Sequence, residues 1–274
     1  MAQKVNAVLF RRSLNCSEWD YKYVKLNKEE ASYLLYKNIE IKKYLKNLFN
    51  SYGFLIINFR LEFFKSGLSI QISFIQDIIC NKLKFGNKSK KKVFIQIIKK
   101  SLMTVLNNYY NKKIFIDLKL IDLNKSFEDS LIKSKNNRLE YLKTFKALKN
   151  LKNYSNFSNL SRLAFIIITN KKSAKLLAKI LSSLISSQKR RHSNILTFIN
   201  KIFDILIYSK LSLISGIKIQ ISGRINGFPR AKSRLLKIGS LPLHSITSTI
   251  DYSESIAYTL NGTFGIKVWV CVKK

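Results

Sequence analysis

Acidic residues are scarce in this chain of 274 residues, which has 15 Asp and Glu against 50 Lys and Arg and a formal net charge of +35. Because so large an excess of one sign destabilises a compact domain by self-repulsion, we expect a polyanionic partner. Hydrophobic residues still make up 46% of the chain, which excludes intrinsic disorder and provides for one large or two small cores. The composition therefore argues against an ordinary cytosolic enzyme and favours a partner that is nucleic acid or an anionic membrane.

Long apolar runs are also lacking. The most apolar helical stretch, residues 196–208, contains Asn200, Lys201 and Asp204. No window approaches the roughly 18–20 uninterrupted apolar residues that a membrane span requires. The basic residues are spread along the whole chain and do not gather on one face of a surface helix. We therefore expect no membrane span, and nucleic acid is the expected partner.

Cysteine and histidine are too few to build a metal or catalytic centre. The three cysteines, Cys16, Cys80 and Cys271, lie far apart without a CxxC pair, so no disulfide framework or zinc site is predicted. His192 and His244 are the only histidines. Carboxylates are not paired in a way that suggests acid–base chemistry. We expect no enzyme activity, no cofactor, no metal ion and no small-molecule substrate.

Hydrophobic periodicity predicts an α+β fold with three zones. The zones are residues 1–124, a compact domain after an N-terminal extension; residues 125–172, an expansion that is partly loop; and residues 173–274. In the first zone the expected elements are a helix at 38–50, strands at 54–64 and 68–74, a loop at 85–89, a helix at 90–108 and a strand at 114–123. The first two strands would form a hairpin around Lys65-Ser66-Gly67.

The last zone predicts two helices on an antiparallel sheet. The expected elements are a helix at 174–185 with Ser173 as its N-cap, a helix at 194–208, and strands at 216–222, 247–251, 257–260 and 266–272. The middle zone has no strong pattern over residues 133–159, and its apolar run at 165–168 is predicted as a strand.

Two short basic segments are candidates for phosphate binding. The loop Gly86-Asn87-Lys88-Ser89 opens a predicted helix that continues with Lys90 and Lys91, and helix N-termini with nearby cations suit phosphate. Its alternative is a solvated lysine-rich turn. The run Lys189, Arg190 and Arg191 joins two predicted helices and is expected to contact RNA, with a solvated elbow as its alternative.

The strongest candidate is a glycine-punctuated basic segment between predicted strands. Its glycines permit turns and close approach of the backbone, and its cations supply forks and point charges for phosphate. The cations are Arg224, Arg230, Lys232, Arg234 and Lys237.

Residues 216–270 resemble the C-terminal domain of the universal small ribosomal subunit protein three family. The residues that carry the resemblance are Gly216-Ile217-Lys218, Ser222-Gly223-Arg224, Asn226-Gly227, Ala231-Lys232, Gly239-Ser240-Leu241-Pro242-Leu243-His244, Ile250-Asp251-Tyr252, Ala257, Gly262 and Gly265 to Val270. The opening Gln3-Lys4-Val5-Asn6 and the helix entering the last zone are also similar to this family. The resemblance implies a type II KH domain around Gly86, where Ser89 stands in place of the family's second glycine.

This resemblance implies a structural protein of the small ribosomal subunit head. Its implied partners are small-subunit rRNA, messenger RNA (mRNA) at the entrance channel and neighbouring head proteins. Depending on the gap in the alignment, the basic positions of the family's entrance helix fall on Lys189 to Arg191 or near Lys201. The alternatives are a free RNA chaperone or a splicing-associated KH protein, and an RNA-processing enzyme, for which the chain offers no catalytic constellation. The preference for Lys, Ile and Asn indicates an AT-biased genome. With the middle expansion, it favours the mitochondrial matrix, with the plastid as the alternative.

Overall fold

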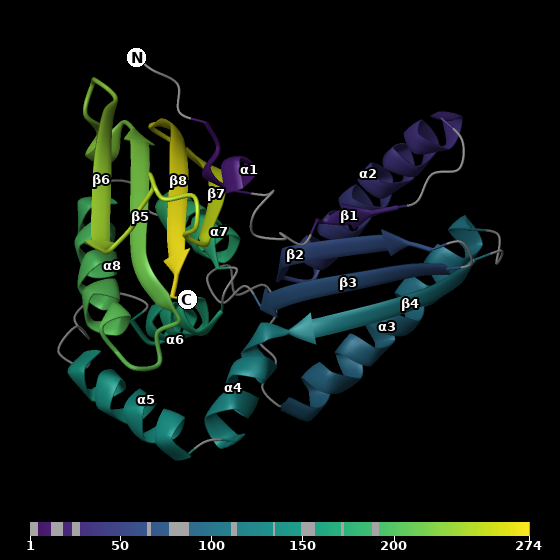
Figure 1. Ribbon diagram of the computed structural model, residues 1–274, viewed down its shortest axis with the longest axis horizontal. Coiled ribbons are helices and arrows are strands. Elements are labelled where there is room, and N and C mark those ends of the chain that lie inside the picture. Colours follow the sequence, from purple (N-terminus) through teal and green to yellow (C-terminus); the bar gives the residue numbers. More distant parts are fainter. Residues whose placement is uncertain are drawn as a thin grey trace. The chain divides into compact units, whose positions relative to one another are not determined.

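The computed structural model describes residues 5–11, 19–23, 28–64, 67–76, 88–110, 114–133, 135–148, 157–170, 173–187 and 192–273. They divide into two compact units, one within residues 18–126 and the other within residues 127–274 together with residues 1–17. Each unit combines helices with a four-stranded sheet, as drawn in Figure 1. The α+β class predicted from the sequence is confirmed.

The unit within residues 18–126 contains the hairpin and helices predicted for the first zone. Its elements are β1 Tyr21–Lys22, α2 Lys28–Ser51, β2 Phe54–Phe63, β3 Gly67–Gln76, α3 Lys88–Tyr109 and β4 Phe115–Asp122. The sheet order is β1-β2-β3-β4, with β2 and β3 antiparallel and β4 parallel to β3. The hairpin prediction is therefore confirmed, and α2 begins ten residues earlier than the sequence pattern indicated.

Helical and strand periodicities meet in the core of this unit. On α2 the residues Ile41, Leu45 and Phe49 are buried at a spacing of four, and β3 buries alternate side chains from Leu68 to Phe74. The ring of Phe49 lies 5.6 Å from that of Phe74. The two helices and the strands thus enclose one hydrophobic cluster.

The second unit contains the predicted two helices on an antiparallel sheet. Its elements are α1 Ala7–Arg11, α4 Leu123–Lys133, α5 Lys135–Leu148, α6 Phe157–Thr169, α7 Ala174–Ser187, α8 His192–Ile207, β5 Ile214–Gly223, the 3-10 turn η2 Ile225–Gly227, β6 Lys232–Gly239, β7 Ile250–Thr259 and β8 Gly262–Val272. The sheet order is β6-β5-β8-β7, and every pairing is antiparallel. The two short strands predicted at 247–251 and 257–260 are one continuous strand, β7.

Helices α7 and α8 cover one face of this sheet. Helix α7 packs on β7 and β8, while α8 packs on β5 and β6 (Figure 1). Ser173 occupies the predicted N-cap position, since its carbonyl accepts from the backbone N–H of Leu177 at 2.9 Å, but its buried hydroxyl has no hydrogen-bond partner among the described residues and does not cap the helix. Instead, the backbone N–H of Ala174 donates to Oδ2 of Asp251 on β7 at 2.9 Å. A strand residue therefore caps α7 and ties it to the sheet.

The middle zone departs most from the sequence-based prediction. Its described part is helical, and the strand predicted at 165–168 is wrong, because these residues lie in α6. A short apolar run buried on all sides cannot be told from a strand by periodicity. The ring of Phe165 lies 4.6 Å from that of Tyr141 on α5, and Arg162 forms a 2.6 Å ion pair with Glu128 on α4.

These helices pack into the unit that holds the C-terminal sheet, as does α1. The backbone N–H of Leu213 donates to the carbonyl of Ile168 at 3.1 Å, and Arg11 on α1 donates to the carbonyl of Leu243 at 2.6 Å. The structural division thus differs from the three zones read from the sequence. Within the described part of the chain, no helix is both long enough and apolar enough to cross a bilayer.

Candidate nucleic-acid interface

The basic segment begins where β5 ends against the core. At Gly223 a Cβ atom would lie 2.5 Å from the ring of Phe264, so only glycine fits at the end of this strand. The chain then turns through Asn226 (φ 56°) and Gly227 (φ 81°), both in the left-handed region. From Lys232 it continues as strand β6. The basic segment, which the sequence places between strands, therefore contains the turn η2 and continues into the edge strand β6.

All the predicted cations of this segment are exposed, namely Arg224, Arg230, Lys232, Arg234 and Lys237. Nε of Arg224 donates to the carbonyl of Phe228 at 3.0 Å, which closes the turn. Nζ of Lys232 lies 5.7 Å from the centroid of the same Phe228 ring. None of these cations forms an ion pair with a carboxylate among the described residues.

Strand register distributes the cations of β6 over two faces of the sheet. Lys237 is opposite Lys218 of β5, so both side chains lie on the face away from α7 and α8. Lys232 and Arg234 have the opposite parity and lie opposite Gly223 and Ile221. Because β6 is an edge strand, side chains on both of its faces remain accessible.

The start of α8 is joined to the turn of the basic segment. The backbone N–H of Asn226 donates to Nδ1 of His192 at 3.3 Å, and its Oδ1 accepts from the backbone N–H of Ser193 at 3.3 Å. Its Nδ2 donates to Oγ of Ser193 at 3.1 Å. His192 is 2% exposed, and its ring lies 5.0 Å from that of Phe264. Asn226 thus fixes the first turn of α8 beside the basic turn.

This link was not predicted from the sequence, although Asn at a position that favours glycine is a recognisable indication of a left-handed turn. The predicted residues Lys189, Arg190 and Arg191 lie outside the described residues. The residue that follows them, His192, is the one held against the basic turn.

The predicted loop before α3 is described only from its helical end. Gly86 and Asn87 lie outside the described residues, and α3 begins at Lys88. Lys90 and Lys91 belong to the first turns of this helix, and their side chains are not described. The helix predicted after this loop is therefore present, and the phosphate site in the loop stays a prediction.

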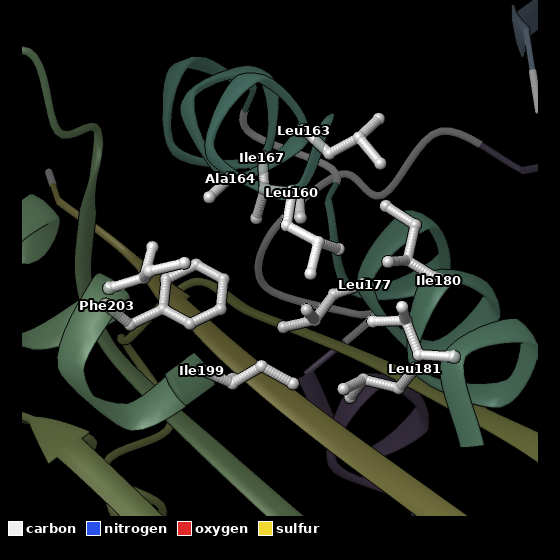
Figure 2. Close-up of a pocket in the computed structure, with 11 residues that line it drawn as sticks. Leu160, Leu163, Ala164, Ile167, Leu177, Ile180, Leu181, Ile199 and Phe203 are labelled. Atoms are coloured by element: carbon white, nitrogen blue, oxygen red, sulfur yellow. The ribbon is translucent and has the colours of Figure 1, made fainter. Parts of the chain in front are cut away.

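No catalytic arrangement was found among the described residues. They contain no group of three or more His, Cys, Asp or Glu side chains that could hold a metal ion. A cavity between α6, α7 and α8 is lined by apolar side chains alone, including Leu163, Leu177 and Phe203 (Figure 2). Burial, reinforced by a hydrogen bond to Glu254, raises the pKa of Tyr252 above its ordinary value.

Comparisons with known proteins match the part of the chain that carries the basic segment. Residues 199–270 match the family described as ribosomal protein S3, C-terminal domain. The small ribosomal subunit protein uS3 of Azobacteroides pseudotrichonymphae genomovar. CFP2 is 52% identical over 56 residues, which cover 20% of this chain and 23% of that protein. The uS3 protein of Bacteroides thetaiotaomicron is 54% identical over 56 residues, with the same two shares.

A longer match is found with the small ribosomal subunit protein uS3c of Euglena gracilis. It is 37% identical over 87 residues, or 32% of this chain and 40% of the relative. The chain therefore spans between 23% and 40% of the length of these three relatives. All of the exposed cations described above fall inside the residues that match the family.

Proposed function

We propose that this chain, whose residues 199–270 match the C-terminal domain of ribosomal protein S3, belongs to that family and is a structural protein of the small ribosomal subunit that binds small-subunit rRNA. The observation that carries this proposal is the basic segment on η2 and β6, whose cations are exposed within the family match. Phosphate contacts of Lys and Arg supply most of the affinity of such proteins for RNA. They also neutralise the +35 charge that opposes folding of the free chain.

We extend the proposal to the N-terminal unit, which would act as a type II KH domain. In favour of this are the order α2-β2-β3-α3-β4 and the parallel pairing of β3 with β4. The start of α3 at Lys88, directly after Gly86-Asn87, also fits a loop that presents backbone N–H groups to phosphate.

The second extension concerns mRNA. We propose that Lys189, Arg190 and Arg191 face mRNA at the entrance channel, and that neighbouring head proteins cover other surfaces. The fixed position of His192, the next residue along the chain, beside the basic turn supports this. Charge reversal at Lys189 and Arg190 should impair initiation on structured mRNAs more than subunit assembly. Equal translation of structured and unstructured mRNAs by that variant would contradict the assignment.

The rRNA proposal is tested by binding of the full chain to a small-subunit rRNA transcript. Replacing Arg224, Arg230, Lys232 and Arg234 with Glu should abolish measurable binding at physiological salt, because the loss of each phosphate contact is compounded by repulsion. The matched control replaces four cations that are exposed on α4 and α5, Lys125, Arg138, Lys143 and Lys146, with Glu. If both variants lose the same affinity, binding depends on net charge alone and the basic segment is not the site.

A further inference from the structure

The face of the C-terminal sheet away from α7 and α8 carries a row of side chains of which only Lys237 belongs to the basic segment described above. One residue of each strand contributes to the row, because register places Lys237, Lys218, Trp269 and Tyr252 opposite one another in turn across β6, β5, β8 and β7. We call these four residues the outer row. Among the described residues, α1 packs at one end of this face, where Ala7 meets Ile250 and Cys271.

Two lysines directly opposite each other are unfavourable in a free sheet. Lys218 and Lys237 face the same side at directly opposite positions, where Cβ atoms are about 5 Å apart and like charges repel. An anion held between the two ammonium groups would convert this repulsion into attraction. The position therefore favours a partner that brings a negative charge onto the sheet.

The aromatic half of the outer row holds Lys218 in place. Nζ of Lys218 lies 4.9 Å from the centroid of the Trp269 ring, within the range of a cation–π interaction. The Tyr252 ring lies 5.2 Å from that of Trp269 and supports it from the other side. Trp269 and Tyr252 are both partly buried, so the ammonium group is positioned before any ligand arrives.

We propose that Lys218 and Lys237 form a clamp for an RNA phosphate on the outer face of the sheet, with Trp269 as the positioning residue of Lys218. The proposal rests on the rRNA-binding function proposed above and adds a second contact surface to it. RNA is favoured over an acidic protein because Lys237 lies on the same strand as Lys232 and Arg234, which are proposed above to bind rRNA, and because a net charge of +35 favours a polyanion. The exposed hydroxyls of Ser222 and Ser233, opposite each other four residues further along, lie on the same face and can bind the sugar–phosphate backbone.

The test measures binding of the full chain to an in-vitro-transcribed small-subunit rRNA of Bacteroides thetaiotaomicron over a range of salt concentrations. Lys218→Ala and Lys237→Ala should each weaken binding roughly tenfold. The double variant should reduce the magnitude of the salt slope by about one, since one phosphate contact is lost. The matched control is Lys267→Ala on the same face, whose position opposite Glu254 makes it less available to phosphate, so a smaller loss is expected.

The role of Trp269 is tested by a double-mutant cycle. Trp269→Leu should weaken RNA binding, and Trp269→Leu combined with Lys218→Ala should weaken it no more than Lys218→Ala alone, because Trp269 acts through Lys218. Thermal unfolding of each variant separates loss of binding from loss of fold. Trp269→Phe, which keeps an aromatic ring, should retain most of the affinity.

A second readout does not depend on affinity. The chain has two tryptophans, so in a Trp19→Phe background Trp269 is the only tryptophan, and its fluorescence should change saturably as the rRNA is added. The clamp would be overturned if the Trp269 fluorescence did not change on addition of the rRNA and if Lys218→Ala bound with wild-type affinity. The same result is expected if a protein, and not RNA, occupies this face. If the wild-type chain itself fails to bind the rRNA, the proposed function fails as well, so the two failures are distinguishable.

Discussion

Asn226 joins two parts of the candidate interface through one side chain. It adopts a left-handed backbone conformation, and its amide contacts the first turn of α8. Asn226→Ala should lower the free energy of unfolding by about 2 kcal/mol, because it removes these hydrogen bonds and places a Cβ at positive φ without compensation.

The control for this prediction is Asn226→Gly, which removes the same hydrogen bonds but tolerates the conformation. Urea unfolding should show the Gly variant about 1 kcal/mol more stable than the Ala variant. Equal stabilities would mean that the turn relaxes in the variants and that the left-handed conformation is not imposed by the fold.

Tyr110 is a buried residue whose hydroxyl has no hydrogen-bond partner among the described residues. Tyr110→Phe should therefore raise the free energy of unfolding by about 1 kcal/mol.

Burial raises the pKa of Tyr110 above its ordinary value, so the folded chain retains a proton that the unfolded chain loses near pH 10. Stability should fall as the pH rises above about 10, and more gradually in the Phe variant. Parallel pH profiles of the two proteins would contradict this.

At the scale of elements, the sequence predicted the helices and strands whose apolar residues recur at a regular spacing. It missed the features that depend on tertiary contacts. Some elements follow regular periodicities and were predicted nearly to their ends, namely helices α3, α7 and α8 and strands β2, β3, β4 and β5. Strand β6 was missed, because exposed Lys and Arg on an edge strand interrupt the alternation of apolar and polar residues. The cap of α7 was assigned to Ser173, since only the fold brings Asp251, 77 residues away, to that helix end.

The helices of the middle zone illustrate the same limit. The local sequence does not indicate which elements their hydrophobic residues pack on. Phe165 of α6 is 1% exposed, and its ring contacts those of Phe127 on α4 and Tyr141 on α5. Phe165→Ala should lower the free energy of unfolding by about 3–5 kcal/mol, since it opens a cavity in this core.

The control for Phe165 is Leu142→Ala on α5, where the side chain is 47% exposed and the change should cost less than about 1 kcal/mol. Chemical denaturation of the two variants compares them directly. A loss at Phe165 as small as that at Leu142 would mean that these helices do not belong to the core.

At the scale of the whole molecule, the sequence gives the net charge directly, and the structure adds how the cations are grouped. A net charge of +35 implies a polyanion, but the sequence could not say which cations act together. The structure groups Arg224, Lys232 and Arg234 around one turn and one strand, and separates Lys237 onto the opposite face with Lys218. That separation follows from strand register, which residue spacing alone does not fix until the strand is recognised.

The central claim is that this chain is an integral rRNA-binding protein of the small ribosomal subunit. The most direct measurement is sucrose-gradient sedimentation of organelle lysate at low and at high salt, with detection of this chain in each fraction. The account predicts that the chain sediments with the small subunit at both salt concentrations, because many phosphate contacts act together within a folded particle. Release into the light fractions at moderate salt would contradict it and would favour a dissociable RNA chaperone.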